Sequence, residues 1–138
     1  EPLPYVPLQA WREGVWFDNT ARYEAGRLAD PKAVAAAAIP VERSDARWLL
    51  IGSRRDEVWA SGAMVSRLAN RLRQAGKGGR VTLLVHDHAG HQVCGSGLSP
   101  TYVWSEPSSD PRVKDLGAEG AAAVQSWRAM KAFLARAL

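Results

Sequence analysis

Two short apolar runs, separated by a helical pattern, constrain the fold of this chain more than any other feature. Residues 47–52 (RWLLIG) and 81–85 (VTLLV) each match a short buried strand. Between them, residues 61–75 place apolar side chains on one helical stripe, with Ser61 in position to cap the helix and Gly76 to end it. A helix between two buried strands implies that the strands are parallel. The sequence therefore predicts a strand–helix–strand unit.

Two strands do not make a stable sheet by themselves. A parallel pair that is covered on both faces requires further strands beside it. We therefore expect an α/β fold in which this chain forms the C-terminal portion of a larger, mostly parallel sheet flanked by helices. Such a fold is incomplete without an N-terminal part.

The remaining segments surround this unit. Residues 1–29 form an aromatic-rich lead that we expect to be irregular, packed over a neighbouring surface or lining a substrate channel. Residues 30–138 are expected to form the α/β part. A short helix should begin after the N-cap Asp30 and stop before Pro40, and a long loop over 86–116 precedes a final helix over about 118–137. The apolar stripe of that last helix is predicted to contain Val124, Trp127, Met130 or Lys131, Leu134 and Leu138.

Composition excludes several classes of protein. The net charge is +4, but the basic residues are scattered and do not form the clustered stripe of a nucleic-acid-binding surface. No run of 18 apolar residues is present, so no membrane span is expected. The single cysteine permits no intrachain disulfide, and no signal peptide is seen. A cytoplasmic location is therefore expected.

Two residues with complementary chemistry follow the two predicted strands. Asp56 comes just after the first strand, and His91 follows Ala89-Gly90 just after the second. Catalytic groups of open α/β sheets lie beyond the carboxyl ends of the strands, so both side chains should meet at one edge. A carboxylate that accepts from one imidazole nitrogen fixes the tautomer and stabilises the imidazolium. Acid before histidine is also the chain order of the α/β-hydrolase triad.

These residues lie within a wider set of motifs that resembles a known family. The segments are Ile39-Pro40-Val41-Glu42-Arg43, Trp48-Leu49-Leu50-Ile51-Gly52, Asp56-Glu57-Val58-Trp59-Ala60-Ser61 and Ala89-Gly90-His91. Together they resemble the C-terminal domain of acyl-CoA thioester hydrolases and bile acid-CoA:amino acid N-acyltransferases, from about residue 35 to the C-terminus. The resemblance implies that Asp56 is the triad acid and His91 the triad base.

The triad nucleophile is missing from this chain. A nucleophile elbow requires Gly-x-Ser-x-Gly or a close variant, whereas Ser96 lies in a Gly-Ser-Gly loop and Cys94 has no such setting. The chain also begins Glu-Pro-Leu-Pro rather than with Met. The resemblance implies that a preceding segment or a separate chain supplies the nucleophile and the oxyanion hole. A homo-oligomer is also possible.

The chain departs from the family pattern in two places. The turn before Asp56 is about one residue longer than usual and carries Arg54 and Arg55, which makes Glu57 a second candidate acid. The two arginines are either solvated or contacts for the phosphates of coenzyme A. After His91 the loop reads QVCGSG, so substrate preference does not carry over from the family.

The other two histidines have simpler interpretations than catalysis. His86 and His88 are expected to lie at the surface or to support the site, because with Asp87 they form only a partial zinc ligand set. No metal and no cofactor is expected. The favoured function is thioester hydrolysis of an acyl-CoA. A carboxylesterase or peptidase on the same fold, an N-acyltransferase and a non-catalytic binding module are the alternatives.

Overall fold

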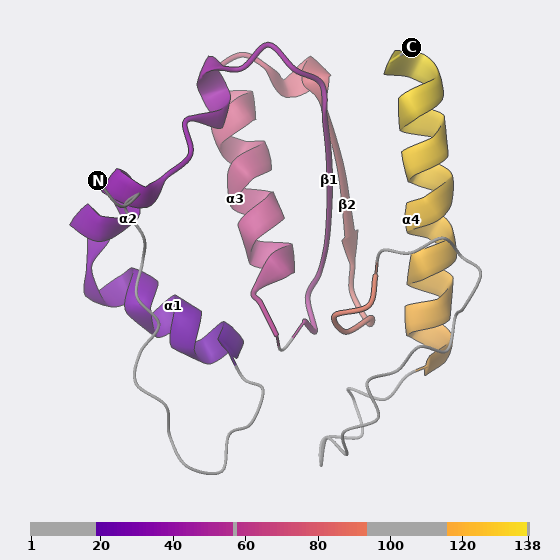
Figure 1. Cartoon of the computed structure of the whole chain (residues 1–138), viewed down its shortest axis with the longest axis horizontal. Coiled ribbons are helices and arrows are strands. Elements are labelled where there is room, and N and C mark those ends of the chain that lie inside the picture. Colours follow the sequence, from indigo (N-terminus) through magenta and orange to yellow (C-terminus); the bar gives the residue numbers. More distant parts are fainter. Residues whose placement is uncertain (1–18, 57, 94–115, 138) are drawn as a thin grey trace, which may run out of the picture.

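A computed structural model describes residues 19–56, 58–93 and 116–137 of the chain. At its centre lies a parallel pair of strands, β1 (Trp48–Ser53) and β2 (Val81–His86), paired in register from Trp48↔Val81 to Ser53↔His86. Each strand begins or ends within one residue of the expected range. The parallel pairing confirms the strand–helix–strand unit, and the chain has a partial α/β fold (Figure 1).

Two helices cover the two faces of this sheet (Figure 1). The connecting helix α3 (Ser61–Gln74) lies on one face, and α4 (Leu116–Ala137) lies on the other. Successive residues of β1 serve the two faces in turn, as the period of a strand requires. Leu50 packs with the buried Ala69 and Leu72 of α3, whereas Ile51 packs into a second cluster made by Ala89, Val93 and Ala122.

The sequence predicted the residue that ends α3 correctly but not the residue that caps its start. Gly76 has a φ of 74°, the left-handed conformation expected of a helix stop. Ser61, in contrast, is the first residue of the helix and not its cap, so that expectation was wrong. Its hydroxyl instead accepts a hydrogen bond from the backbone N–H of Ser53 at 3.1 Å and so ties the helix to the end of β1.

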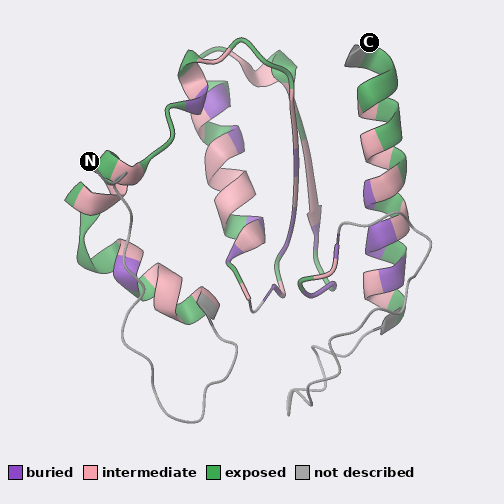
Figure 2. Ribbon diagram, viewed as in Figure 1, coloured by how far each residue is buried: buried purple, intermediate pink, exposed green. Residues whose placement is uncertain are grey.

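The final helix buries a different face from the expected one. Its buried residues are small (Gly120, Ala122, Ala123 and Ser126), while Leu134 is half exposed and Trp127 only partly buried. Figure 2 shows the buried positions of α4 in the half of the helix nearest the carboxyl ends of the strands. The expected stripe is therefore not the buried face of the described part of α4, because Ala122 packs there with Ala89 and Val93. Leu138 lies outside the described residues.

Residues 19–29 correct the expectation of an irregular lead, because they form a regular helix, α1 (Asn19–Ala29). Glu24 pairs with Arg27 one turn later and with Arg67 of α3, at 2.9 and 2.8 Å, which holds α1 against the rest of the fold. Residues 1–18 of the lead lie outside the described residues. The next helix, α2 (Pro31–Ala37), begins as expected, with Asp30 Oδ1 accepting from the N–H of Ala33.

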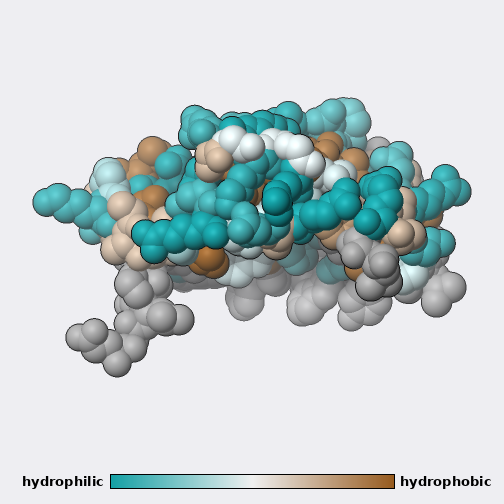
Figure 3. Space-filling view, turned by 90° about the horizontal axis from the view of Figure 1, so that it is seen from above, coloured by the Kyte–Doolittle hydropathy of each residue, from teal (hydrophilic) through white to brown (hydrophobic). Residues whose placement is uncertain are grey.

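The end of the molecule at which the strands begin is polar. Two short 3₁₀ turns, Val41–Arg43 and Gly78–Arg80, lie there, with ion pairs between Arg71 and Glu42 at 2.5 Å and between Lys77 and Asp45 at 3.1 Å. Seen from this side, the surface is mostly hydrophilic (Figure 3). Within the described part of the chain, none of the helices has the length and apolar character needed to span a bilayer.

Candidate active site

Two turns at the carboxyl ends of the strands are tied directly to each other. The N–H of Arg54 donates to the carbonyl of His86 at 2.9 Å and so extends the strand pairing by one bond. Ser53 as a whole is 2% exposed. Its hydroxyl donates toward two carbonyl oxygens, that of His86 at 3.3 Å and that of Ala89. A buried hydroxyl shared between both turns fixes the turn after β1 relative to the turn after β2.

The first turn holds Asp56 in a buried position. Its Oδ1 accepts hydrogen bonds from the backbone N–H groups of Val58 and Trp59, both at 3.0 Å. These bonds satisfy two backbone donors of the turn that precedes α3 and fix the carboxyl group within that turn. From α1, the hydroxyl of Thr20 donates to the Asp56 carbonyl at 2.7 Å. The carboxyl group is thus oriented by its own turn.

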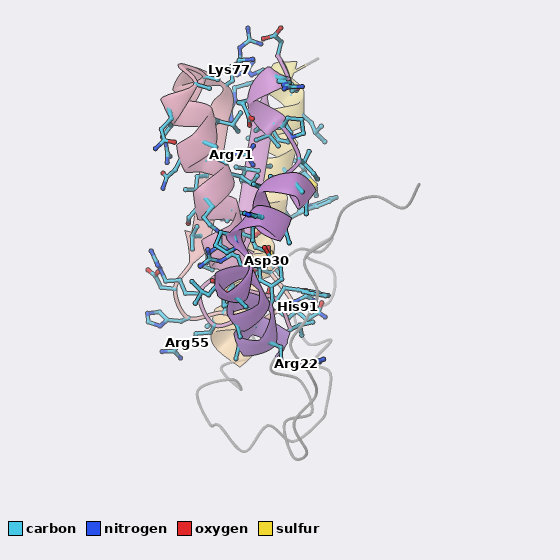
Figure 4. All side chains as sticks on the ribbon, turned by 90° about the vertical axis from the view of Figure 1, so that its left-hand side faces the viewer. Arg22, Asp30, Arg55, Arg71, Lys77 and His91 are labelled. Atoms are coloured by element: carbon cyan, nitrogen blue, oxygen red, sulfur yellow. The ribbon has the colours of Figure 1, made fainter. Side chains whose placement is uncertain are left out.

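The second turn brings His91 to this carboxyl group. His91 Nδ1 lies 3.0 Å from Asp56 Oδ1. The Asp56 side chain is 2% exposed and the His91 side chain 40% exposed, so the acid is shielded while the imidazole reaches the surface. Viewed from the side, His91 lies at the same end of the molecule as Arg22 and Arg55, far from Lys77 (Figure 4).

This geometry has a direct chemical consequence. A carboxylate only accepts hydrogen bonds, so the proton of a neutral His91 ring lies on Nδ1. The other ring nitrogen, Nε2, is then left with its lone pair and can take a proton from another group. The negative charge of Asp56 stabilises the imidazolium that results. The pair is therefore suited to general base and general acid chemistry.

A second acidic residue, which the sequence did not single out, lies beside this pair. The carboxyl group of Glu119, in the first turn of α4, accepts hydrogen bonds from the backbone N–H groups of Gly90 and Gln92. Burial raises the pKa of Glu119, and the charge of Asp56 adds to that rise, although the two hydrogen bonds and His91 oppose it. The only sequence signal was an acidic residue near a predicted helix start.

The neighbouring histidines differ from each other. His88 is exposed, as expected, but His86 is buried and its Nε2 lies 2.9 Å from the hydroxyl of Ser126 in α4. The surface interpretation was therefore wrong for His86. Burial lowers the pKa of His86, although the nearby Asp87 opposes this effect, so the neutral ring is favoured. His86 joins β2 to α4.

The remaining candidates divide between the surface and the undescribed segments. Arg54 forms an exposed ion pair with Asp87 at 2.7 Å, which is what a solvated arginine would do. Within the three described ranges, no cluster of three His, Cys, Asp or Glu side chains is arranged to hold a metal ion. Glu57, Cys94 and Ser96 lie outside the described residues.

Fold and sequence together define the class of this protein. A parallel sheet covered by a helix on each face, with an acid and a histidine after consecutive strands, is the C-terminal part of an α/β-hydrolase fold. The chain belongs to the family described as BAAT / acyl-CoA thioester hydrolase C terminal, whose model matches residues 16–138. This family is associated with hydrolase and acyltransferase enzymes. No match was found among curated proteins or among solved structures.

Proposed function

We propose that this chain supplies the acid and the base of an acyl-CoA thioester hydrolase, with Asp56 orienting His91. The observation that carries the proposal is the 3.0 Å contact between a shielded carboxyl oxygen and a partly exposed imidazole at the carboxyl ends of neighbouring strands. Either residue alone has an ordinary structural explanation. Their contact, in the chain order of a triad and in a chain of this family, supports a shared catalytic role.

In the proposed reaction, His91 moves one proton at each step. Nε2 takes the proton of a serine or cysteine nucleophile as that atom attacks the thioester carbonyl carbon. When the carbon–sulfur bond breaks, the imidazolium returns the proton to the leaving thiolate. A water molecule then gives a proton to Nε2 and attacks the acyl-enzyme, and the same proton finally restores the nucleophile. Asp56 holds Nδ1 throughout and stabilises each imidazolium.

The nucleophile and the oxyanion hole are proposed to come from outside residues 1–138. The 138 residues contain no Gly-x-Ser-x-Gly sequence and no cysteine variant of it. In the described part of the chain the sheet has only two strands, fewer than a parallel sheet needs for stability. Both observations support a preceding segment or a second chain that completes the sheet and the triad.

The test is to measure hydrolysis of acyl-CoA thioesters by the complete polypeptide, including any segment that precedes Glu1, and by its His91→Ala variant. We expect turnover to fall by on the order of 10³-fold or more, since His91 is the proposed base for the nucleophile's proton. His88→Ala is the matched control, because His88 lies three residues earlier and is exposed. Unchanged turnover in His91→Ala would contradict the proposal.

A second candidate, N-acyl transfer, is favoured by the family description, which includes acyltransferases of the BAAT type. The two reactions share the acyl-enzyme and differ only in whether water or an amine attacks it. Adding glycine or taurine to the same assay separates them. Formation of an N-acyl amino acid at the expense of free acid would favour the acyltransferase.

A further inference from the structure

The carboxyl group of Glu119 reaches from α4 to the loop that carries His91. It accepts the N–H groups of Gly90 and Gln92, the residues immediately before and after the histidine. A Cβ atom on Gly90 would lie only 2.5 Å from Glu119 Oε1, which shows how closely the carboxyl group sits against the loop. One side chain thus holds the backbone on both sides of His91.

The Glu119 contact restrains the backbone of the His91 loop, whereas Asp56 contacts the imidazole ring. Asp56 touches the imidazole at Nδ1 and leaves the backbone of the loop to other partners. Ser53 restrains the loop only at its start, through the carbonyl oxygens of His86 and Ala89. Without Glu119, the backbone N–H groups of Gly90 and Gln92 would lose these hydrogen bonds to α4.

A simpler explanation is that Glu119 only complements the positive end of a helix dipole. An acidic residue in the first turn of a helix interacts favourably with the helix dipole even when it is fully solvated, so this interaction does not require burial. Glu119 is instead partly buried, and burial raises its pKa, which means that the fold disfavours its charged form. Its two hydrogen bonds also go to the His91 loop rather than to α4 itself. These features favour a role toward the loop.

We propose that Glu119 is a positioning residue that holds the His91 loop so that the imidazole stays aligned with Asp56. This inference rests on the proposed function. Glu119→Ala removes the contact, and Gly90→Ala tests it from the other side. The φ of Gly90 lies outside the left-handed region, and the nearest atom to its Cβ position outside Glu119 is the Arg55 carbonyl oxygen, at 3.9 Å. An alanine at position 90 therefore fits the backbone and displaces mainly the Glu119 carboxyl group.

The experiment measures thioester turnover by the complete polypeptide for the two single variants and the double variant. Each single variant should lower kcat by on the order of 10- to 100-fold with KM nearly unchanged, because small misplacement of a catalytic group slows chemistry more than binding. The double variant should be no slower than Glu119→Ala alone, since both changes remove one contact. Glu42→Ala is the control, because it also removes a carboxyl group but at the opposite end of the sheet. We expect this variant to keep wild-type turnover.

A second readout separates positioning from loss of folded protein. The proton that His91 Nδ1 shares with Asp56 should give a low-field proton NMR resonance, lost or broadened in Glu119→Ala and Gly90→Ala while the thermal midpoint of unfolding is little changed. Wild-type turnover in Glu119→Ala, or additive losses in the double variant, would overturn this inference. If His91→Ala itself is fully active, the proposed function fails instead, and the two failures are distinguished. If Glu119→Ala does not fold, Gly90→Ala still decides the question.

Discussion

Both ends of the sheet carry exposed ion pairs, but among the described residues the carboxyl end adds a shielded carboxyl group, that of Asp56. At the amino end of the strands, carboxylates pair with basic residues in solvent, as Asp45 does with Lys77 at 3.1 Å, with an Asp45 side chain that is 83% exposed. At the carboxyl end, Asp56 is shielded and its partners are two backbone N–H groups and an imidazole. Exposed pairs contribute little to stability, whereas a shielded carboxyl group with several fixed partners holds a geometry. This difference indicates that the fold fixes the position of the Asp56 carboxyl group at the carboxyl end more firmly than it fixes the exposed ion pairs.

The largest effect should follow from Asp56→Asn, which removes the charge at the carboxyl end with almost no change of shape. Thioester turnover by the complete polypeptide should fall by on the order of 10³- to 10⁴-fold, because an amide neither enforces the His91 tautomer nor stabilises the imidazolium. Asp87→Asn is the control, since Asp87 is an exposed acid in the neighbouring turn and pairs only with Arg54 among the contacts described. Equal turnover in the two variants would contradict a special role for the shielded carboxyl group of Asp56.

Two glycines test the contrast through packing rather than charge. A Cβ on Gly62, at the start of α3, would lie 2.7 Å from the Ser53 carbonyl oxygen and 2.8 Å from its carbonyl carbon. Because these are backbone atoms next to the Asp56 turn, Gly62→Ala must shift α3 or β1 and should cost about 1–3 kcal/mol of unfolding free energy. At the amino end, a Cβ on Gly79 meets nothing within 4 Å.

Gly79→Ala is therefore the matched control for Gly62→Ala. Chemical denaturation of both variants and the wild type measures the difference. Comparable stabilities for the two variants would mean that α3 adapts at no cost, and that the turn holding Asp56 is looser than its contacts imply.

Local patterns were sufficient for the parts of the fold that depend on single segments. The apolar runs predicted both strands. Their ends predicted that Asp56 and His91 would meet, because the turns after neighbouring parallel strands lie at the same edge of the sheet. Gly76 marked the end of α3 for an equally local reason. None of these features depends on which helix face meets the sheet.

The parts that failed depend on packing between distant segments. The large apolar residues of α4 suggested its buried face, but the sheet accepts the side with Ala122, Ala123 and Ser126. Ser61 was expected to cap α3, because capping needs only local spacing, and it binds β1 instead. Glu119 could not be found from the sequence, since its partners become neighbours only when α4 packs beside the His91 loop.

The smallest effect, and the finest test of the contrast, concerns the pH dependence of stability at the two ends. Burial raises the pKa of Glu119, so the folded state favours the protonated carboxyl group. The stability that Glu119 contributes is therefore present in acid and is lost as pH rises through the raised pKa. The hydrogen bond and charge of Lys77 lower the pKa of Asp45, whose contribution is present above the pKa of the unfolded chain and lost as pH falls through the lowered one. Wild type should therefore lose stability relative to Glu119→Gln, and gain it relative to Asp45→Asn, as pH rises from acidic to neutral. Denaturation midpoints across this range at low salt, where surface charges are least screened, measure both differences. The same sign for both variants would show that the carboxyl end does not bury Glu119 against the His91 loop.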